Sequence, residues 1–216
     1  DLITSIIDTA LKHVVFDGWS EKTVKQVCRE LKLDPIKLRQ VFPRGGVDMA
    51  LAFHQRDDER FLEQYSVLEV NQSVRDRIES AISTRLLIAS DNKEAVKRSI
   101  SLLTTPMYLT DGTKALWSTA DKIWNSIGDE SDDLNWYSKR FILSSVYSSA
   151  VLYWMEDDSE NFLETKGFVK RRISDVMKIE QLKGVFKKSP IFNDFLRKCE
   201  VGFNDFIKRK QSFPGW

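Results

Sequence analysis

The sequence has few of the residues from which catalytic and metal centres are built. Its 216 residues include only two cysteines and two histidines. Cys28, Cys199, His13 and His54 lie far apart and match no metal-ligand spacing. The sequence also lacks a nucleophile elbow, a phosphate-binding loop and a dinucleotide-binding fingerprint. We therefore expect a protein that is not an enzyme, with no catalytic residue, no metal and no cofactor.

Long apolar runs and an excess of charge are lacking too. The stretch Phe141–Met155 carries no ionisable side chain except two tyrosines, but it has 15 residues, four of them serine. A membrane-spanning helix needs about 20 apolar residues. The net charge of +1 means that a surface for polyanions could only be local. Residues 1–11 have the pattern of an amphipathic helix rather than a secretory signal, so we expect any targeting peptide to precede them.

Helical periodicity is abundant, and strand alternation is almost absent. With 9 glycines and 5 prolines, the connections should be short. The pattern predicts an all-α protein of about ten helices. The predicted helices cover about residues 2–15, 20–31, 35–42, 47–69, 74–89, 93–103, 112–127, 132–155, 159–182 and a last segment from 190.

Residues 20–42 have the pattern of a helix-turn-helix. In a DNA reader, the short helix would present Lys37, Arg39 and Gln40 to the major groove. Residues 17–46 carry a local net charge of +3, which is a modest footprint. The alternative is a compact three-helix unit with ordinary surface lysines.

Acidic residues gather in two runs, "RDDER" at 56–60 and "MEDDSE" at 155–160. Such runs at helix edges are usually solvated faces or caps. We therefore do not expect them to be catalytic.

The helix predicted at 132–155 combines a stripe of small residues with a bulky apolar stripe. Small side chains let another backbone approach closely, or they leave volume for a chain-like ligand. Arg140 would lie at the mouth of such an apolar slot, where a cation suits a phosphate or another polar headgroup. The alternative is a core helix at a helix–helix or dimer interface. The candidate lipid-binding residues are Arg140, Leu116, Trp117, Ile123, Trp124, Phe141, Ser144, Tyr147, Ser148, Val151 and Trp154.

The last segment, from Pro190, is basic and rich in phenylalanine at helical spacing. Residues 183–216 have a net charge of +5, which favours an amphipathic helix on a membrane surface. The alternative is a helix docked on its own core or on a partner subunit. The candidate membrane-binding residues are Phe192, Phe195, Leu196, Lys198, Phe203, Phe206, Lys208 and Arg209.

Trp136 and Tyr137 are large aromatic residues in the charged segment "GDESDDLNWYSKR". They could cap the core or form a hot spot for a protein partner. The residues alone leave both interpretations open.

The segment "GDESDDLNWYSKRFILSSVYSSAVLYWMEDDSENF" and the following "VKRRISDVM" closely resemble the family of the mitochondrial coenzyme Q biosynthesis protein nine, in particular a fungal member. The resemblance covers most of the chain, is strongest at about residues 116–177 and is loose in the tail. The "GWSEKTVKQVCRELKLD" and "FPRGG" segments agree with it, and they look like the degenerate helix-turn-helix of the tetracycline-repressor-like fold of that family.

This resemblance implies a homodimer that binds isoprenoid lipids or quinone intermediates and no nucleic acid. It implies presentation of a quinone precursor to the di-iron demethoxyubiquinone hydroxylase, within the coenzyme Q synthetic complex. The protein would be located on the matrix side of the inner mitochondrial membrane, to which it would bind peripherally. Arg140 would match the family's headgroup arginine, and the hydroxylase-binding surface would match Asp121, Asp133, Trp136 and Tyr137.

The expected organisation has three parts. Residues 1–46 form the degenerate helix-turn-helix, 47–182 the lipid-binding and dimerisation domain, and 183–216 a linker and the membrane-binding helix. The alternative function is a ligand-responsive transcription regulator of the same fold, because "DPIKLRQVF" retains Lys37, Arg39 and Gln40.

Overall fold

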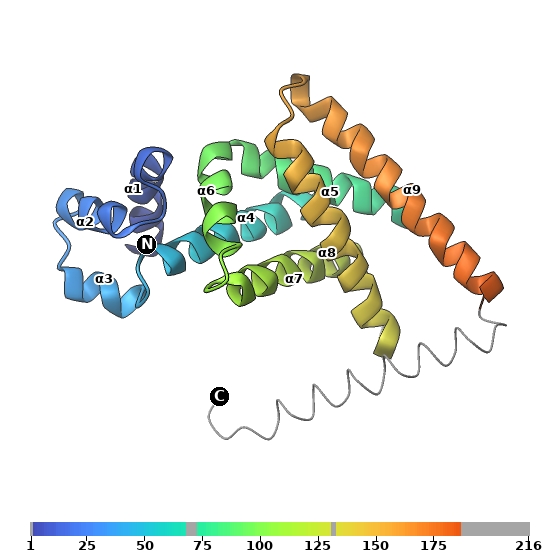
Figure 1. Cartoon of the computed structure of the whole chain (residues 1–216), viewed down its shortest axis with the longest axis horizontal. Coiled ribbons are helices and arrows are strands. Elements are labelled where there is room, and N and C mark those ends of the chain that lie inside the picture. Colours follow the sequence, from blue (N-terminus) through green and yellow to red (C-terminus); the bar gives the residue numbers. More distant parts are fainter. Residues whose placement is uncertain (1, 68–72, 131–132, 187–216) are drawn as a thin grey trace. The chain divides into compact units, whose positions relative to one another are not determined.

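The computed structural model describes residues 2–67, 73–130 and 133–186, except for the side chains of 133–135 and 179–186. Within these ranges the chain forms nine α-helices and one short 3-10 helix, with no strand (Figure 1). The all-α prediction is confirmed. The elements are α1 (Leu2–Asp17), α2 (Glu21–Glu30), α3 (Pro35–Val41), α4 (Gly46–Ser66), α5 (Val74–Ser90), α6 (Lys93–Leu103), α7 (Leu109–Ser126), α8 (Asp133–Met155), η1 (Glu160–Phe162) and α9 (Leu163–Phe186).

Helix α7 begins at Leu109, three residues before the predicted start at Gly112. A Cβ on Gly112 would lie 2.8 Å from the carbonyl oxygen of Leu103, closer than real Cβ atoms come to such a group. The glycine therefore allows the first turn of α7 to pack against the end of α6.

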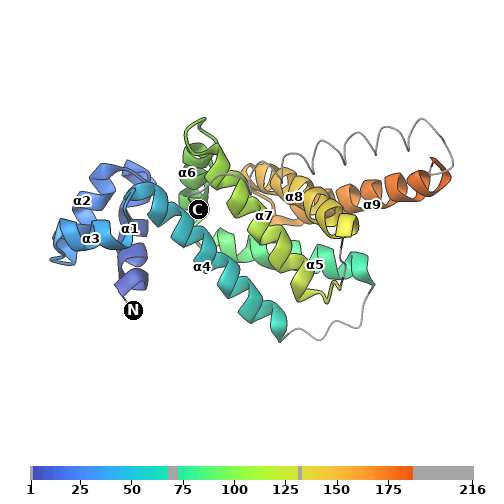
Figure 2. The same ribbon diagram turned by 90° about the horizontal axis from the view of Figure 1, so that it is seen from below.

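The first three helices form a unit at the N-terminal end of α4, as Figures 1 and 2 both show. Ser20 caps α2 by accepting a hydrogen bond from the backbone N–H of Lys22. Asp34 caps α3 in the same way, and Pro35 follows at the first helical position. The side-chain caps and Pro35 therefore set the starts of these two helices.

The N-terminal unit shares its core with α4 and α6. The buried cluster contains Val27 and Leu38 together with Phe53 of α4 and Ala95 of α6. The indole Nε1 of Trp19 donates to the Ala95 carbonyl at 3.2 Å. These contacts join the first three helices to the rest of the bundle.

The remaining bundle is built around α4, α7 and α8. Helix α7 packs on α4 and α8, and α5 packs on α4 (Figure 2). The chain divides into two compact units, Asp1–Arg171 and Arg172–Trp216, and the division falls within α9. The first unit contains the sites described below. Among the described helices, none is long and apolar enough to span a bilayer.

Candidate functional site

A cavity of about 260 Å³ lies among α4, α5, α6, α7 and α8. Most of its wall is apolar, and a polar group stands where α4 and α5 meet it. The lining residues are Phe53, His54, Asp57, Arg85, Leu86, Ala89, Val96, Ser99, Ile100, Leu103, Thr104, Leu109, Gly112, Thr113, Ala115, Leu116, Tyr147, Ser148, Val151, Leu152 and Trp154.

The structure brings about half of the predicted lipid-binding residues to this cavity. Leu116, Tyr147, Ser148, Val151 and Trp154 line it. The other six are not among the lining residues, and these are Arg140, Trp117, Ile123, Trp124, Phe141 and Ser144. Helix α8 therefore contributes its predicted bulky stripe, while α7 contributes Leu116 but neither of its tryptophans.

The predicted residues outside the cavity lie in several environments. Ile123 is a fully buried core residue, and Ser144 is buried on α8. Trp124 donates from Nε1 to the carbonyl of Lys139 at 3.0 Å. Phe141 is 67% exposed, so it faces away from the bundle core.

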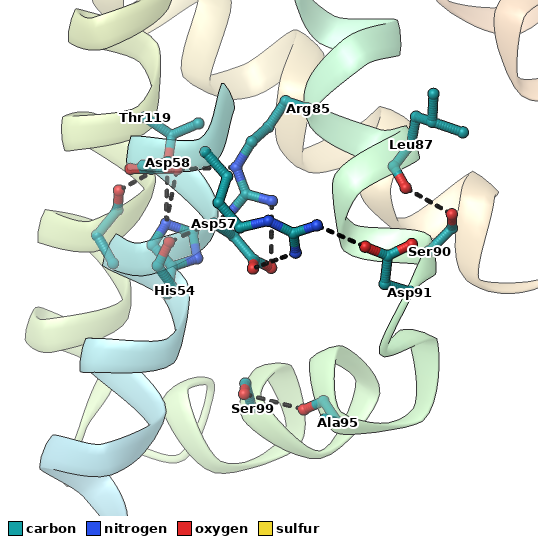
Figure 3. Close-up of polar contacts among 12 residues, drawn as sticks. His54, Asp57, Asp58, Arg85, Leu87, Ser90, Asp91, Ala95, Ser99 and Thr119 are labelled. Atoms are coloured by element: carbon teal, nitrogen blue, oxygen red, sulfur yellow. Dashed lines mark hydrogen bonds and ion pairs between the residues drawn. The ribbon is translucent and has the colours of Figure 1, made fainter. Parts of the chain in front are cut away.

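The sequence-based prediction missed a polar cluster centred on Asp58 of α4 (Figure 3). Its members His54, Asp57 and Arg85 line the cavity, whereas Asp58 lies behind them and does not. Arg85 of α5 donates from Nε to Asp58 Oδ1 at 2.8 Å. From α7, Thr119 donates to the same carboxylate at 3.0 Å, and Lys122 donates at 3.1 Å. Burial by itself would raise the pKa of Asp58, but His54, Arg85 and Lys122 hold that pKa below its ordinary value. Asp58 is therefore a buried carboxylate with a full set of donors.

His54 and Asp57 complete this polar group. His54 Nε2 lies 2.8 Å from Thr119 Oγ1, and burial lowers the pKa of His54 to about 4. The imidazole is therefore neutral at physiological pH. Burial raises the pKa of Asp57 to about 6, although Arg85, Arg56 and Arg60 pull it down.

The interpretation of "RDDER" as a solvated run is wrong for its two aspartates. Asp57 and Asp58 are each 1% exposed. The helical spacing carried a signal for this, because Asp57 falls four residues after Phe53 and four before Phe61, both of which are buried. In α5, Arg85 likewise stands on the same face as the buried Ile78 and Ile82.

Arg140 lies outside the cavity and is 1% exposed. Its guanidinium donates to Asp121 from Nε, to Asn125 from Nη2 at 3.0 Å and to Asp129 from Nη1 at 3.2 Å. It also lies 4.0 Å from the centre of the Trp136 ring. The arginine therefore joins α7 to α8 through protein acceptors. Its role as a headgroup cation stays a prediction, which this geometry disfavours.

The aromatic residues around Arg140 form a surface cluster of Trp117, Trp136 and Tyr137. The Trp136 and Tyr137 rings meet edge to face at 4.8 Å, and Trp117 lies 5.9 Å from Trp136. Trp136 is half-buried, whereas Tyr137 is 40% exposed. Asp121, the predicted acidic neighbour, accepts from Arg140 and Asn125. The side chain of Asp133 lies outside the described residues.

The helix in the position of a DNA-reading helix is α3, and its arginine is already engaged. Arg39 donates twice to the carboxylate of Glu21 at 2.6 Å and once to the carbonyl of Pro43 at 3.1 Å. This pairing neutralises one of the three side chains that would contact DNA. Lys37 and Gln40 remain exposed.

The predicted membrane-binding tail lies outside the described residues. This applies to Phe192, Phe195, Leu196, Lys198, Phe203, Phe206, Lys208 and Arg209 alike.

The arrangement of helices defines the class of fold. The chain resembles the crystal structure of the TetR transcriptional regulator from Nitrosomonas europaea, with a TM-score of 0.65 over 80% of this chain and 96% of that one. The two sequences are 18% identical, so the likeness concerns the fold. The protein has the tetracycline-repressor-like helical fold, as the sequence predicted.

Within that class the resemblance to the COQ9 family is confirmed. The COQ9 family model matches residues 109–180, which include α7, α8 and most of α9. The chain is 26% identical over 209 residues to the protein named "Probable ubiquinone biosynthesis protein coq9, mitochondrial" of Dictyostelium discoideum. It is 27% identical to the human and 29% identical to the rat "Ubiquinone biosynthesis protein COQ9, mitochondrial".

These relatives are longer than the matched region. The alignments cover 93%, 80% and 80% of this chain, and 68%, 56% and 57% of the Dictyostelium, human and rat proteins. None of these three organisms is a fungus, so a fungal origin stays a prediction.

Proposed function

We propose that this chain is a non-enzymatic, lipid-binding protein of ubiquinone biosynthesis. The cavity holds the apolar chain of an isoprenoid lipid or quinone intermediate. The protein then presents the head of that molecule to the di-iron demethoxyubiquinone hydroxylase of the coenzyme Q synthetic complex. The observation that carries the proposal is the mostly apolar cavity among α4–α8, in a chain whose relatives are named for ubiquinone biosynthesis.

The chemistry of the cavity wall suits a hydrocarbon chain. Leu86, Leu103, Leu116 and Val151 supply apolar surface from four different helices. Burying apolar surface yields about 25 cal/mol per Å², so a chain gains affinity with each segment that enters. The volume of about 260 Å³ lies just below the usual range of ligand pockets, which is about 300 to 1,000 Å³. The cavity therefore fits one part of a long isoprenoid, and the remainder would leave through its opening.

The aromatic cluster of Trp117, Trp136 and Tyr137 is the proposed contact with the hydroxylase. Tyrosine and tryptophan dominate protein-binding hot spots because their rings bury much area at little entropic cost. The guanidinium of Arg140 lies against the Trp136 ring, 4.0 Å from its centre, and this contact helps to hold the cluster in place.

The proposed location is the matrix side of the inner mitochondrial membrane, where the basic, phenylalanine-rich tail would bind the phospholipid surface. The relatives named mitochondrial support the organelle. The proposed assembly is a homodimer. Helix α8 offers apolar surface for it at Phe141, which is 67% exposed and does not line the cavity.

Replacing Ser148 by phenylalanine tests the cavity. Ser148 lines it, and the added ring would fill the volume that a chain needs. We expect the affinity for a short-chain isoprenoid quinone to fall at least about tenfold in a fluorescence titration.

Ser145→Phe is the matched control. Both serines belong to α8 and donate to a backbone carbonyl of their own helix, but Ser145 is exposed and does not line the cavity. The control should bind like the unmodified chain. Equal binding by both variants would exclude this cavity as the ligand site.

Replacing Tyr137 by alanine tests the partner surface. A hot-spot truncation costs about 2 kcal/mol or more, so binding to the hydroxylase should weaken roughly 30-fold in a pull-down or calorimetric titration. The melting temperature should change little, because Tyr137 is 40% exposed.

Tyr153→Ala is the matched control, since Tyr153 lies on the same helix and is 37% exposed. It should leave hydroxylase binding intact. Trp136→Ala is a less specific test of partner binding than Tyr137→Ala. Trp136 is half-buried against Arg140, so its loss should also lower the stability of the fold.

A further inference from the structure

The polar cluster beside the cavity contains two buried carboxylates, and only one of them, Asp57, lines the cavity. Asp58 accepts hydrogen bonds from Arg85, Thr119 and Lys122. Neither oxygen of Asp57 has a hydrogen-bond partner, although the residue is 1% exposed. The nearest charged groups are guanidinium nitrogens of Arg85 and Arg60, at 3.6 and 3.7 Å. These distances are too long for hydrogen bonds.

An unsatisfied buried carboxylate is costly, and a ligand can remove that cost. Leaving a buried polar group without a partner costs about 1 to 3 kcal/mol, and more for a charged group. Burial also raises the pKa of Asp57 to about 6, which leaves the carboxylate mainly ionised at neutral pH. An ionised carboxylate can only accept hydrogen bonds. The group that completes Asp57 must therefore be a donor.

The surrounding charges argue against an anionic ligand. Among the described residues of this polar group, each cation already faces carboxylates. Arg85 contacts Asp57 and Asp58, Lys122 contacts Asp58, and Arg60 pairs with Asp91 at 2.7 Å. A phosphate or carboxylate head would add a third negative charge next to the two buried aspartates. Like charges in a partly buried site repel strongly.

Trp154 adds a donor to the same cavity. It is 0% exposed and lines the cavity from α8, and its indole Nε1 has no acceptor. The cavity thus contains an acceptor and a donor that both lack partners, within a wall that is otherwise mostly apolar. A hydroxyl-bearing head with a further oxygen atom complements this pair, since it donates once and accepts elsewhere.

We propose that the cavity selects an uncharged amphiphile whose alcohol or phenol hydroxyl donates a hydrogen bond to Asp57, and that it rejects anionic heads. This inference rests on the proposed lipid-binding function and names the ligand class and the residue that selects it. It concerns the molecule before presentation: the head lies at Asp57 while the ligand is held in the cavity, and it leaves that position when the protein presents it to the hydroxylase. Asp57 acts as a specificity-determining residue, with Trp154 as the second polar contact.

Three ligands whose apolar chains differ by no more than one carbon test this in the full chain by calorimetric titration. Decanol can donate a hydrogen bond, decyl methyl ether can only accept one, and decanoate is anionic. A hydrogen bond to a charged group contributes about 1.5 to 3 kcal/mol, so decanol should bind at least about tenfold more tightly than the ether. Decanoate should bind more weakly than decanol by a similar factor.

Asp57→Asn should reduce the preference for decanol over the ether to about threefold or less, and it should strengthen decanoate binding. Asp91→Asn is the matched control: Asp91 also pairs with Arg60, but its side chain is 54% exposed and it does not line the cavity. The control should keep the preference of the unmodified chain. Trp154→Phe should weaken decanol and the ether alike, because it removes a donor and leaves Asp57 in place.

The outcomes separate this inference from the proposed function. If none of the three ligands binds the unmodified chain, the cavity does not hold apolar chains and the proposed function fails. If decanol and the ether bind equally, the cavity function stands and the selection by Asp57 is overturned. A preference for decanol that persists in a folded Asp57→Asn variant would likewise exclude Asp57 as the acceptor. The ligand series on the unmodified chain needs no variant, so a variant that does not fold leaves the inference testable.

Discussion

Replacing Asp58 by alanine is expected to lower the free energy of unfolding by about 3 to 5 kcal/mol, because it removes the partner of a buried cation. Asp58 is 1% exposed, and Arg85, Thr119 and Lys122 all donate to it. Without the carboxylate, the Arg85 guanidinium would stay buried beside Asp57 alone. Urea unfolding followed by circular dichroism measures the effect.

The control for this variant is Asp91→Ala. Asp91 accepts from Arg60 at 2.7 Å, but its side chain is 54% exposed. Exposed ion pairs contribute about 0 to 1 kcal/mol, so this loss should be small. Similar losses in the two variants would mean that the Asp58 network does not join α4, α5 and α7 as described.

Replacing Arg140 by alanine should cost about 3 kcal/mol of stability, because it removes the hydrogen bonds that a buried guanidinium donates to Asp121, Asn125 and Asp129. Asp129, 5% exposed, would keep Lys139, whereas Asp121 would lose its only ion pair in the described structure. The Trp136 ring would also lose the guanidinium that lies against it. We therefore expect lower stability together with weaker hydroxylase binding, measured by denaturant titration and calorimetry.

This variant also decides between two roles for Arg140. A structural role predicts lost stability with lipid affinity nearly retained in the folded protein. A headgroup role predicts the reverse, namely lost lipid affinity with an unchanged unfolding midpoint. Arg39→Ala serves as the control for removing an arginine from a surface ion pair, since the side chain of Arg39 is 41% exposed.

The helices of this protein could be predicted because their local signals agree with their packing. On α8, the predicted bulky stripe consists of Leu143, Tyr147, Ala150, Val151 and Trp154; four of these are buried and Val151 is partly buried. Periodicity reports which face of a helix is buried, and hydrophobic burial is the largest stabilising contribution. It does not report what the buried face contacts. Leu116 and Trp117 are neighbours in sequence, yet Leu116 lines the cavity and Trp117 belongs to the surface cluster.

The polar part of the cavity could not be predicted from residue types alone. Charged residues are mostly exposed, so a run such as "RDDER" favours a solvated face. Asp57 and Asp58 are buried because partners more than 25 residues away, on α5 and α7, meet them in the folded chain. The available signal was the position of a charged residue on an apolar helical stripe. This position indicates that the side chain is buried, but it does not indicate which residue the side chain contacts.

The region that the family model matches contains only some of the residues that line the cavity. The family model begins at Leu109 and therefore includes the α7 and α8 walls. His54, Asp57 and Arg85 lie before that region. Asp57, the residue proposed to select the ligand, thus lies in the part of the chain that the family model leaves unmatched, whereas Trp154, the second polar contact, lies inside the matched region.

The shared core of the N-terminal helices has a practical consequence for shortening this protein. Phe53 and Val96 each pack in the cluster around Val27 and also line the cavity. A fragment starting at Val47 would lack α1 to α3, so Phe53 and Val96 would become exposed to water on the side that these helices cover. Such a fragment should aggregate or collapse the cavity, so studies of ligand binding need the first three helices even though none of their residues lines the cavity.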